Sequence, residues 1–389
     1  MENSEKYSFF HDLYRRFGKS AVAWCGVAGI IFLSIPAIFA PFIANGRPLL
    51  MISSDGVWSM PFLHSFFAPE SSEVLVEKLF NFLALYLPVA VVLKRLSRRK
   101  KLRRTLLAVT ALLIAAGFFA GVPVMDKQNY RQLAGKERFA LFAAIPYGPD
   151  EIVGEPYEAP GRRHILGCDD IGRDLAARVI YGSRVSLAVG VLAATVAMAI
   201  GLTVGMSAGY FRGKMDLLLM RLVEIMQCFP TFLLLLILMS LLGDYQIAQS
   251  IPLVILVIGC TGWIGVAFLV RGEVLKESSL AYVKSCVVSG VSPWKIMFKH
   301  LLPNISGTVL ISFTFGVAGA ILSESSLSFL GFGVQPPTAS WGNLMRQAFD
   351  NPMAYWHLTF FPGMMLFIAV MSFNFTGDAL RRAFDVKED

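Results

Sequence analysis

Long apolar runs separated by polar segments dominate this chain. Each run is close to the roughly 20 residues that an α-helix needs to cross a bilayer. Eight such runs are predicted to span a membrane, at residues 21–43, 74–93, 105–124, 185–210, 217–242, 251–270, 305–322 and 357–373. The pattern therefore predicts an all-α, polytopic transmembrane bundle of about eight spans.

Composition supports a membrane protein. The chain has 389 residues, of which 55% are hydrophobic and only 16% are charged. Its mean hydropathy is +0.60. A soluble domain of this length needs far less apolar surface. We therefore expect an integral, multi-pass protein of a plasma membrane.

The net charge of +8 comes from one place. Residues 94–104 hold eight Lys or Arg and no acid, so the rest of the chain sums to about zero. Such a cluster is typical of a cytoplasmic loop and not of a nucleic-acid groove, because no aromatic side chains accompany it. With 94–104 inside, residues 44–73 and 125–184 lie outside, and an even number of spans places both termini in the cytoplasm.

The most informative polar segment is 271–304, between the sixth and seventh predicted spans. It is too charged to cross a membrane and predicts two short helices on the bilayer surface. The first ends at Gly290, which favours a left-handed cap, and Ser292 with Pro293 suits the start of the second. Pro303 is expected to close that second helix. A surface hairpin of this kind suits a docking site for another protein.

The residues of this segment resemble a known motif. Residues 283–286, Gly290 and the run 299–304 are similar to the cytoplasmic "EAA" loop of bacterial ABC importer permeases. The resemblance implies that the loop binds a cleft on an ATP-hydrolysing subunit. Its contact residues would be Lys284, Ser285, Cys286 and Gly290, with His300 and Pro303 setting the second helix. Lys284 reverses the charge of the family's glutamate, so the role of that glutamate cannot be assigned to Lys284. An acidic residue is expected opposite Lys284 on the ATPase.

A second resemblance lies before the fourth predicted span. Residues 164–174, HILGCDDIGRD, are similar to a run in C-type peptide permeases, with Cys168 in place of the usual Thr. The likeness covers the first span and about 164–384. Residues 45–50 and 55–56 also resemble the branch that takes up peptides such as microcin C.

The expected organisation has three parts. Residues 1–43 form a cytoplasmic amino terminus and the first span, and 44–163 form periplasmic loops with an extra transmembrane hairpin at about 74–124. Residues 164–389 form the permease core, with its coupling loop at 271–304. Because the family has six spans, the extra hairpin at about 74–124 is a departure from it.

These resemblances imply a permease subunit that moves oligopeptides or dipeptides across a bacterial inner membrane. Its expected partners are a homologous permease in a heterodimer, two ATP-binding ABC subunits, a periplasmic or lipid-anchored peptide-binding protein and membrane lipid. No nucleic acid and no cofactor are expected. The chain itself is not expected to be an enzyme, since Gly209–Lys214 lacks the spacing and the Ser/Thr of a Walker A motif.

Four features in or beside the predicted spans have structural interpretations. Gly201, Gly205 and Gly209 recur every four residues and favour close packing of a second helix. Glu324 either lines the transport route or caps a broken helix. Arg221 and Glu224, three residues apart, suit an ion pair at the inner interface, and Pro230 suits a kink in the same span.

Other classes were weighed. His164 and Asp169 have the HxxxxD spacing of a membrane-bound acyltransferase, in which the histidine acts as base. A metal site from His164, Cys168, Asp169 and Asp170 is not expected, because its ligand types are mixed and the spacing matches no zinc pattern. An ion-coupled carrier or channel would favour intramembrane charge pairs or internal repeats, which are not evident. The five cysteines show no paired spacing that would indicate a disulfide framework.

Overall fold

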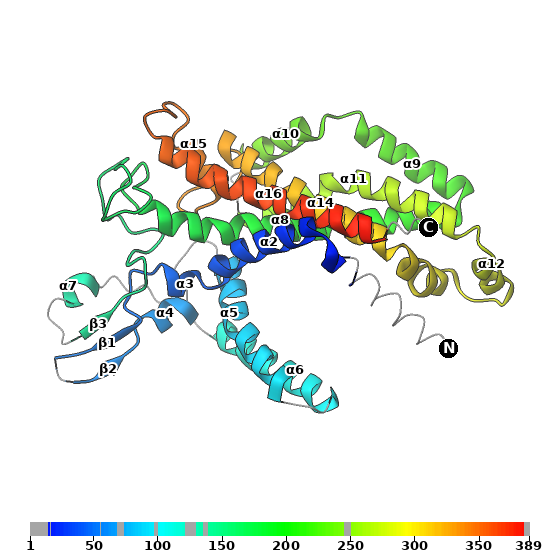
Figure 1. The fold of residues 1–389 in the computed structure, drawn as a ribbon. Helices are drawn as coiled ribbons and strands as arrows, with labels where there is room; N and C mark the ends of the chain where they lie inside the picture. Colours follow the sequence, from blue (N-terminus) through cyan, green and yellow to red (C-terminus); the bar gives the residue numbers. More distant parts are fainter. Residues whose placement is uncertain are drawn as a thin grey trace. The chain divides into compact units, whose positions relative to one another are not determined.

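The computed structural model describes residue 15 and residues 17–54, 56–67, 74–96, 100–120, 130–134, 139–244 and 250–384. The chain divides into two compact units. The first combines Met1–Ile31, Val189–Gly333 and Leu366–Asp389, and the second combines Phe32–Ala188 and Val334–Met365. Each unit is described separately (Figure 1).

Among the described residues, six helices are long and apolar enough to cross a membrane. They are α2 (Ala21–Ile38), α5 (Val74–Leu96), α8 (Leu175–Phe211), α11 (Ile251–Glu277), the continuous segment Pro293–Leu330 and α16 (Trp356–Phe384). A seventh span results if α9 (Gly213–Gln227) and α10 (Thr231–Asp244) count together. This pair bends by 80° just beside Pro230, a sharper break than the predicted kink.

The predicted span at residues 105–124 is not among these helices. It corresponds to α6 (Lys100–Ala120), whose first turns carry basic residues. Only Thr105–Ala120 remains as the apolar part that the structure describes, and 121–124 lie outside the described residues. The described chain therefore has six or seven candidate spans, where the sequence predicted eight.

In the first unit, the carboxyl-terminal half of α8 packs closely on α11. A Cβ atom on Gly201 would meet Val266 Cβ at 2.5 Å, and one on Gly205 would meet the Ala267 carbonyl oxygen at 2.6 Å. Gly209 faces Val274 in the same way. Only glycine lets the two backbones approach this far. α11 in turn packs along α14 (Leu302–Leu330).

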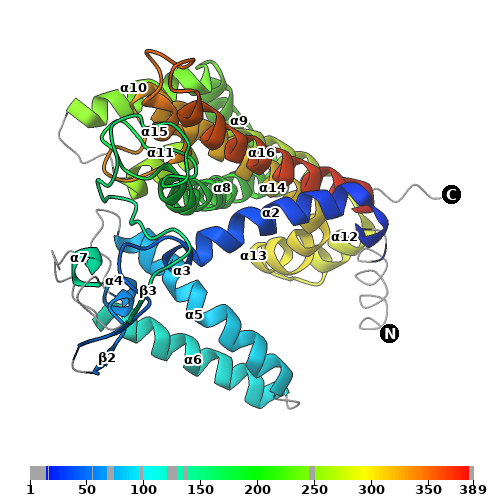
Figure 2. The same ribbon diagram turned by 60° about the vertical axis from the view of Figure 1, so that its left-hand side comes forward.

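The second unit contains the extra hairpin. Its helices α5 and α6 lie side by side (Figure 2). Nearby are the short helices α3 (Ala40–Ile43), α4 (Phe62–Phe67) and α7 (Tyr130–Ala134) and a three-stranded antiparallel sheet, β2-β1-β3, of Trp58–Ser59, Leu50–Ile52 and Phe139–Leu141. The hydrophobic pattern does not predict this sheet, because its strands have only two or three residues.

One buried arginine ties the hairpin to its unit. Arg184 of α8 donates from Nε to the Ala37 carbonyl at 2.6 Å and from Nη2 to Asn81 Oδ1 at 2.9 Å. Asn81 of α5 donates in turn to the Phe66 carbonyl at 2.8 Å. The guanidinium thus satisfies a free carbonyl near the end of α2 and anchors α5 to it.

Two helix boundaries differ from the sequence prediction. α8 begins at Leu175, ten residues before the expected start, because the Asp174 carboxylate accepts from the Ala177 amide at 2.9 Å and caps it. α14 continues past residue 322 to Leu330 and ends at Gly331, which has φ +89°. Glu324 therefore lies inside an unbroken helix, and its predicted role as the cap of a broken one is wrong.

The prediction for Pro303 is also wrong. After α13 (Pro293–Lys295), a π-helical stretch η1 (Ile296–Leu301) leads directly into α14, with Pro303 in its first turn. The Leu302 amide donates to the Met297 carbonyl, five residues back. The wider π turn leaves room before the proline ring, and a first-turn proline needs no amide donor. Pro303 thus lies where α14 begins and closes no helix.

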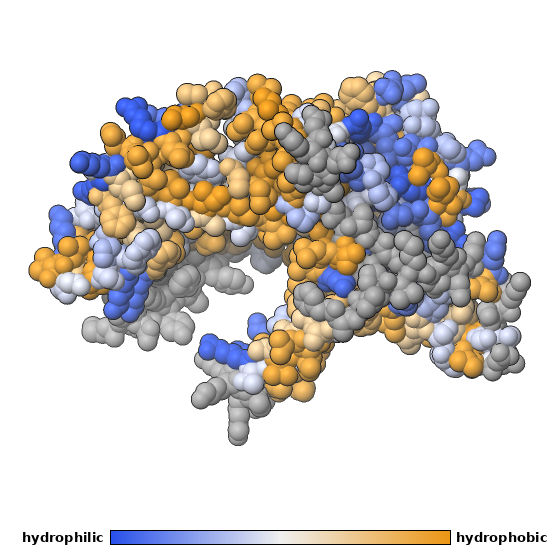
Figure 3. Space-filling model, turned by 180° about the vertical axis from the view of Figure 1, so that it is seen from behind, coloured by the Kyte–Doolittle hydropathy of each residue, from blue (hydrophilic) through white to orange (hydrophobic). Residues whose placement is uncertain are grey.

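Apolar side chains cover much of the helical surface, as the face in Figure 3 shows. On α9 and α10 the exposed apolar side chains are Met215, Leu217, Leu218, Leu222, Ile225, Phe232, Leu233, Ile237 and Leu241. Lipid tails or another apolar helix would cover such a surface, as expected of membrane-spanning helices.

Candidate functional site

The segment between α11 and α14 packs on an apolar core that it shares with α11. α12 (Ala281–Val288) contributes buried Val283, and η1 contributes Ile296 and Leu301, against Val270 and Val274 of α11. All five side chains are 2% exposed or less. Burial on this scale fixes the segment on the ends of α11 and α14.

Polar contacts fix the same segment at its two ends. The Tyr282 hydroxyl donates to Glu277 Oε2 at 2.9 Å and accepts from Asn304 Nδ2 at 2.8 Å. Partial burial raises the pKa of Tyr282, so its hydroxyl stays protonated and can donate to Glu277. Arg212, which precedes α9, reaches Ser278 Oγ at 2.9 Å. The loop before α12 is therefore joined to Arg212, and α12 itself is joined to the end of α11 and the start of α14.

The turn after α12 has the predicted conformation. Gly290 has φ +72°, and the Val291 amide donates to the Cys286 carbonyl at 3.1 Å across it. Ser292 is extended and Pro293 begins the next helix, as expected, but the Ser292 side chain makes no capping bond. The left-handed glycine therefore makes the reversal.

The outer face of the segment carries exposed apolar side chains. Val288 is 88% exposed, and Trp294 and Phe298 are 58% and 56% exposed. The two rings stack with centroids 6.1 Å apart. None of these three residues was predicted as part of the site. A tryptophan and a phenylalanine in a charged segment could nevertheless have indicated an interface. An exposed apolar patch on this otherwise polar segment between α11 and α14 is typical of a protein interface.

The residues expected to make the coupling contact lie on the same segment as this patch. Lys284 and Ser285 are exposed, whereas Cys286 is half-buried against the core below. His300 is also half-buried, and Pro303 is exposed at the start of α14. The structure thus brings all of them onto one short segment, with Cys286 facing inward.

A cavity of about 240 Å³ lies within the first unit, among α8, α10, α11 and α14. Small side chains line it, including Ala193, Gly262 and Gly316, together with the hydroxyls of Thr231 and Ser323. Hydroxyl and backbone groups could hydrogen-bond a polar ligand without a fixed charge.

Glu324 follows Ser323 directly in α14. Its side chain is 0% exposed and accepts from Ser328 Oγ at 2.7 Å and from Ser325 Oγ at 3.3 Å. These bonds stay within one helix. They compensate the burial of a carboxyl, which favours a structural role for Glu324.

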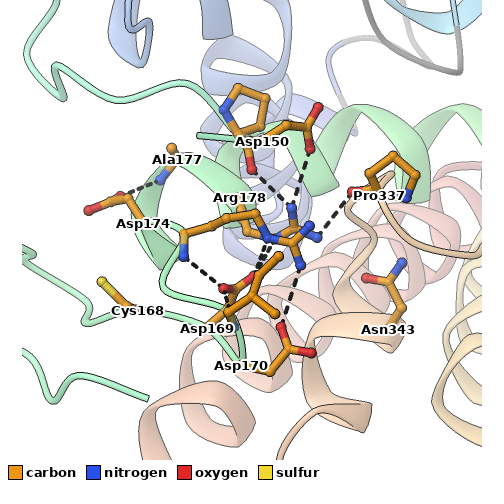
Figure 4. A network of polar contacts seen from close by, with 12 residues as sticks. Asp150, Cys168, Asp169, Asp170, Asp174, Ala177, Arg178, Pro337 and Asn343 are labelled. Atoms are coloured by element: carbon orange, nitrogen blue, oxygen red, sulfur yellow. Dashed lines mark hydrogen bonds and ion pairs between the residues drawn. The ribbon is translucent and has the colours of Figure 1, made fainter. Parts of the chain in front are cut away.

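The loop before α8 carries a buried ionic network (Figure 4). Asp169 Oδ2 lies 2.6 Å from Arg173 Nε and 3.2 Å from Arg178 Nε, and all three side chains are 5% exposed or less. Arg178 also donates to the carbonyls of Pro149 and Pro337, at 2.9 and 3.2 Å. The network joins three separate chain segments of the second unit.

The acyltransferase pair is not formed. His164 Nδ1 lies 2.8 Å from Asp174 Oδ2, while Asp169 is taken by the two arginines. His164 and Asp169 are both 0% exposed, so neither can reach an acyl substrate. A zinc site that included Asp169 is excluded for the same reason. Instead, Glu158 lies beside His164 and Cys168, and the sequence held no signal for it.

Comparisons with known proteins agree with this architecture. Residues 201–388 match the family model described as binding-protein-dependent transport system inner membrane component. The chain is 40% identical over 226 residues to the oligopeptide transport system permease OppC of Haemophilus influenzae, covering 58% of this chain and 71% of that protein.

Two further similarities extend the comparison. The glutathione transport system permease GsiD of Pectobacterium atrosepticum is 35% identical over 230 residues, or 59% of this chain and 75% of that protein. A solved structure of the MetNI methionine ABC transporter covers 54% of this chain and 97% of that chain, at 19% identity and a TM-score of 0.44. From the sequence relatives, the chain belongs to the family of inner-membrane permease components of binding-protein-dependent ABC importers.

Proposed function

We propose that this chain is a permease subunit that imports oligopeptides or dipeptides, driven by ATP that separate subunits hydrolyse. Relatives named as oligopeptide and dipeptide permeases support the substrate class. The cavity's small side chains and hydroxyls suit a ligand whose common feature is a peptide backbone.

The observation that carries the proposal is the exposed apolar patch of Val288, Trp294 and Phe298. It lies on a segment that packs on the apolar core beneath it and that the distribution of basic residues predicts to be cytoplasmic. Stacked aromatic side chains are typical anchors of protein interfaces. The ATPase subunit would cover this patch, with Lys284 at its rim.

The same segment supplies a route for the motion. Pro293–Leu330 is one continuous helical element, so a displacement of its first turns moves the whole of α14. α14 packs along α11 and contributes Gly316 and Ser323 to the cavity wall. Movement of the ATPases would thereby change the shape of the cavity without any covalent chemistry on the substrate.

The remaining partners follow from the class of importer. A homologous permease would form the other wall of the path, two ATPases would bind on the inner face, and an extracytoplasmic peptide-binding protein would deliver cargo. Both termini would lie in the cytoplasm of a bacterial inner membrane.

A matched pair of variants tests the docking face. Val288 and Met353 are each 88% exposed, and Met353 lies between α15 (Trp341–Arg346) and α16. Val288→Asp should lower peptide uptake and ATPase copurification about tenfold or more, as loss of an interface anchor does. Met353→Asp should leave ATPase copurification unchanged. Equal copurification of ATPases with both variants would contradict the proposal.

A further inference from the structure

Three donor atoms of different chemistry converge in the loop before α8. Glu158 Oε2 lies 3.9 Å from Cys168 Sγ and 4.0 Å from His164 Nε2, and all three atoms lie within 4.8 Å of one another. Donors around a tetrahedral zinc ion are separated by about 3.3–3.6 Å. A shift of well under 1 Å in each side chain would close the triangle.

His164 is already arranged as a metal ligand. Its ring is 0% exposed, and its Nε2 atom makes no hydrogen bond although it points at Glu158 and Cys168. On the other side of the ring, Nδ1 lies 2.8 Å from Asp174 Oδ2. A carboxylate there holds the proton on Nδ1 and leaves the Nε2 lone pair free, the arrangement found behind most metal-bound histidines.

Gly154 keeps the space between the donors open. A Cβ atom on this residue would lie 2.5 Å from Cys168 Sγ, 2.7 Å from Glu158 Oε2 and 3.1 Å from His164 Nε2. Its φ angle is not in the left-handed region, so the conformation itself does not require glycine. The absent side chain therefore matters for the space among the three donors.

We propose that Glu158, His164 and Cys168 bind one borderline divalent transition-metal ion of the Zn²⁺ class, with Asp174 positioning the histidine. One nitrogen, one sulfur and one oxygen donor suit Zn²⁺, whereas Mg²⁺ and Ca²⁺ need oxygen ligands. Water would complete the coordination.

Binding has a defined proton balance. The buried Cys168 thiol carries a proton in the free site, and a metal ion binds only the thiolate. Metal binding replaces that proton: the S–H bond breaks, the S–metal bond forms and one proton enters solvent. Affinity should therefore increase with pH.

The ion would hold the loop that leads to the ionic network. Cys168 directly precedes Asp169, which binds Arg173 and Arg178. The Cys168 amide also donates to the Glu158 carbonyl at 2.9 Å, so two of the ligands share a backbone bond. A bound ion would add a second link at the same place.

Cobalt titration of the full chain tests the site. The protein is purified in detergent with a tag free of histidine, stripped with a chelator and titrated with Co²⁺ and then Zn²⁺. We expect one ion per chain, a thiolate-to-cobalt absorption band, displacement by Zn²⁺ and release of one proton. Absence of the band, or a band from a different cysteine, would overturn the proposal.

Variants locate the ion and separate binding from folding. Cys168→Thr should abolish the band, and Gly154→Ala should weaken binding although every ligand remains. Asp174→Asn keeps the helix cap but should lower affinity about 10- to 100-fold. Cys286→Ser is the matched control and should leave the titration unchanged. Helical circular dichroism checks that each variant folds; unchanged affinity in both folded Cys168→Thr and Gly154→Ala would overturn the assignment.

Discussion

Arg271 of α11 donates two parallel hydrogen bonds to the Asp216 carboxylate of α9, from Nε to Oδ1 at 2.5 Å and from Nη2 to Oδ2 at 2.7 Å. The two residues are 55 positions apart, and Arg271 begins the segment proposed to bind the ATPase. The bidentate geometry fixes the angle between the first turn of α9 and the end of α11.

Arg271→Lys should loosen this joint, because an ammonium cannot make both bonds. We expect a loss of about 1 kcal/mol of stability and ATP turnover that no longer depends on transported peptide. Arg221→Lys is the control, since the Arg221–Glu224 pair is more than half exposed on both sides. Peptide-stimulated ATPase assays of the reconstituted complex measure the difference. Full stimulation in Arg271→Lys would contradict this role.

Gly290→Ala isolates the turn after α12. Residue 290 has φ +72° and open space where a Cβ would lie, so the cost is conformational alone, about 1–2 kcal/mol. Gly272→Ala, in α11 and equally open, should be neutral or slightly stabilising. We expect slower uptake per ATP hydrolysed in Gly290→Ala only. Equal coupling ratios in the two variants would argue against a function for this turn.

Gly205→Ala tests the contact between α8 and α11. The new Cβ would meet the Ala267 carbonyl oxygen at 2.6 Å, a backbone atom that cannot move aside alone. Such overpacking should cost about 1–3 kcal/mol and lower the thermal midpoint in detergent. Gly265→Ala, at an open position of α11, should leave that midpoint unchanged. Identical unfolding curves for the Gly205→Ala and Gly265→Ala variants would contradict a tight contact between α8 and α11.

The pH dependence of Cys168 gives a fourth test. Burial raises its pKa from an ordinary value of 9.0 to about 12. Its stabilising contribution is therefore fully present below pH 9 and is lost as the pH rises toward 12. At pH 8 in the metal-free protein, a maleimide should modify half-buried Cys286 faster than Cys168, which should react only after unfolding. Equal rates measured by mass spectrometry would contradict this burial.

Local rules were enough for some of the fold. The left-handed turn at Gly290 follows from a glycine ahead of Ser292 and Pro293, and the break near Pro230 follows from one proline. Pro303 misled the same reasoning, because a π-helical stretch changes what a proline does to the helix after it. Such a stretch depends on tertiary packing and leaves no pattern in the sequence.

The functional sites also divide into features that the sequence predicts and features that it does not. The coupling segment was found as one contiguous run of polar residues, whereas its apolar patch was missed. His164 was paired by spacing with Asp169, but the loop folds back and places Asp174 and Glu158 around it. The spacing of residues in an irregular loop does not determine which side chains meet.

The most direct test of the central claim is the side of the membrane on which residue 288 lies. In a chain without its five natural cysteines, Val288→Cys and Met353→Cys are labelled with a membrane-impermeant maleimide, in intact cells and in inverted vesicles. The account predicts that position 288 is labelled only in inverted vesicles and is protected when the ATPases are bound, whereas position 353 is labelled only in intact cells. Labelling of position 288 from outside, or no protection by the ATPases, would contradict it.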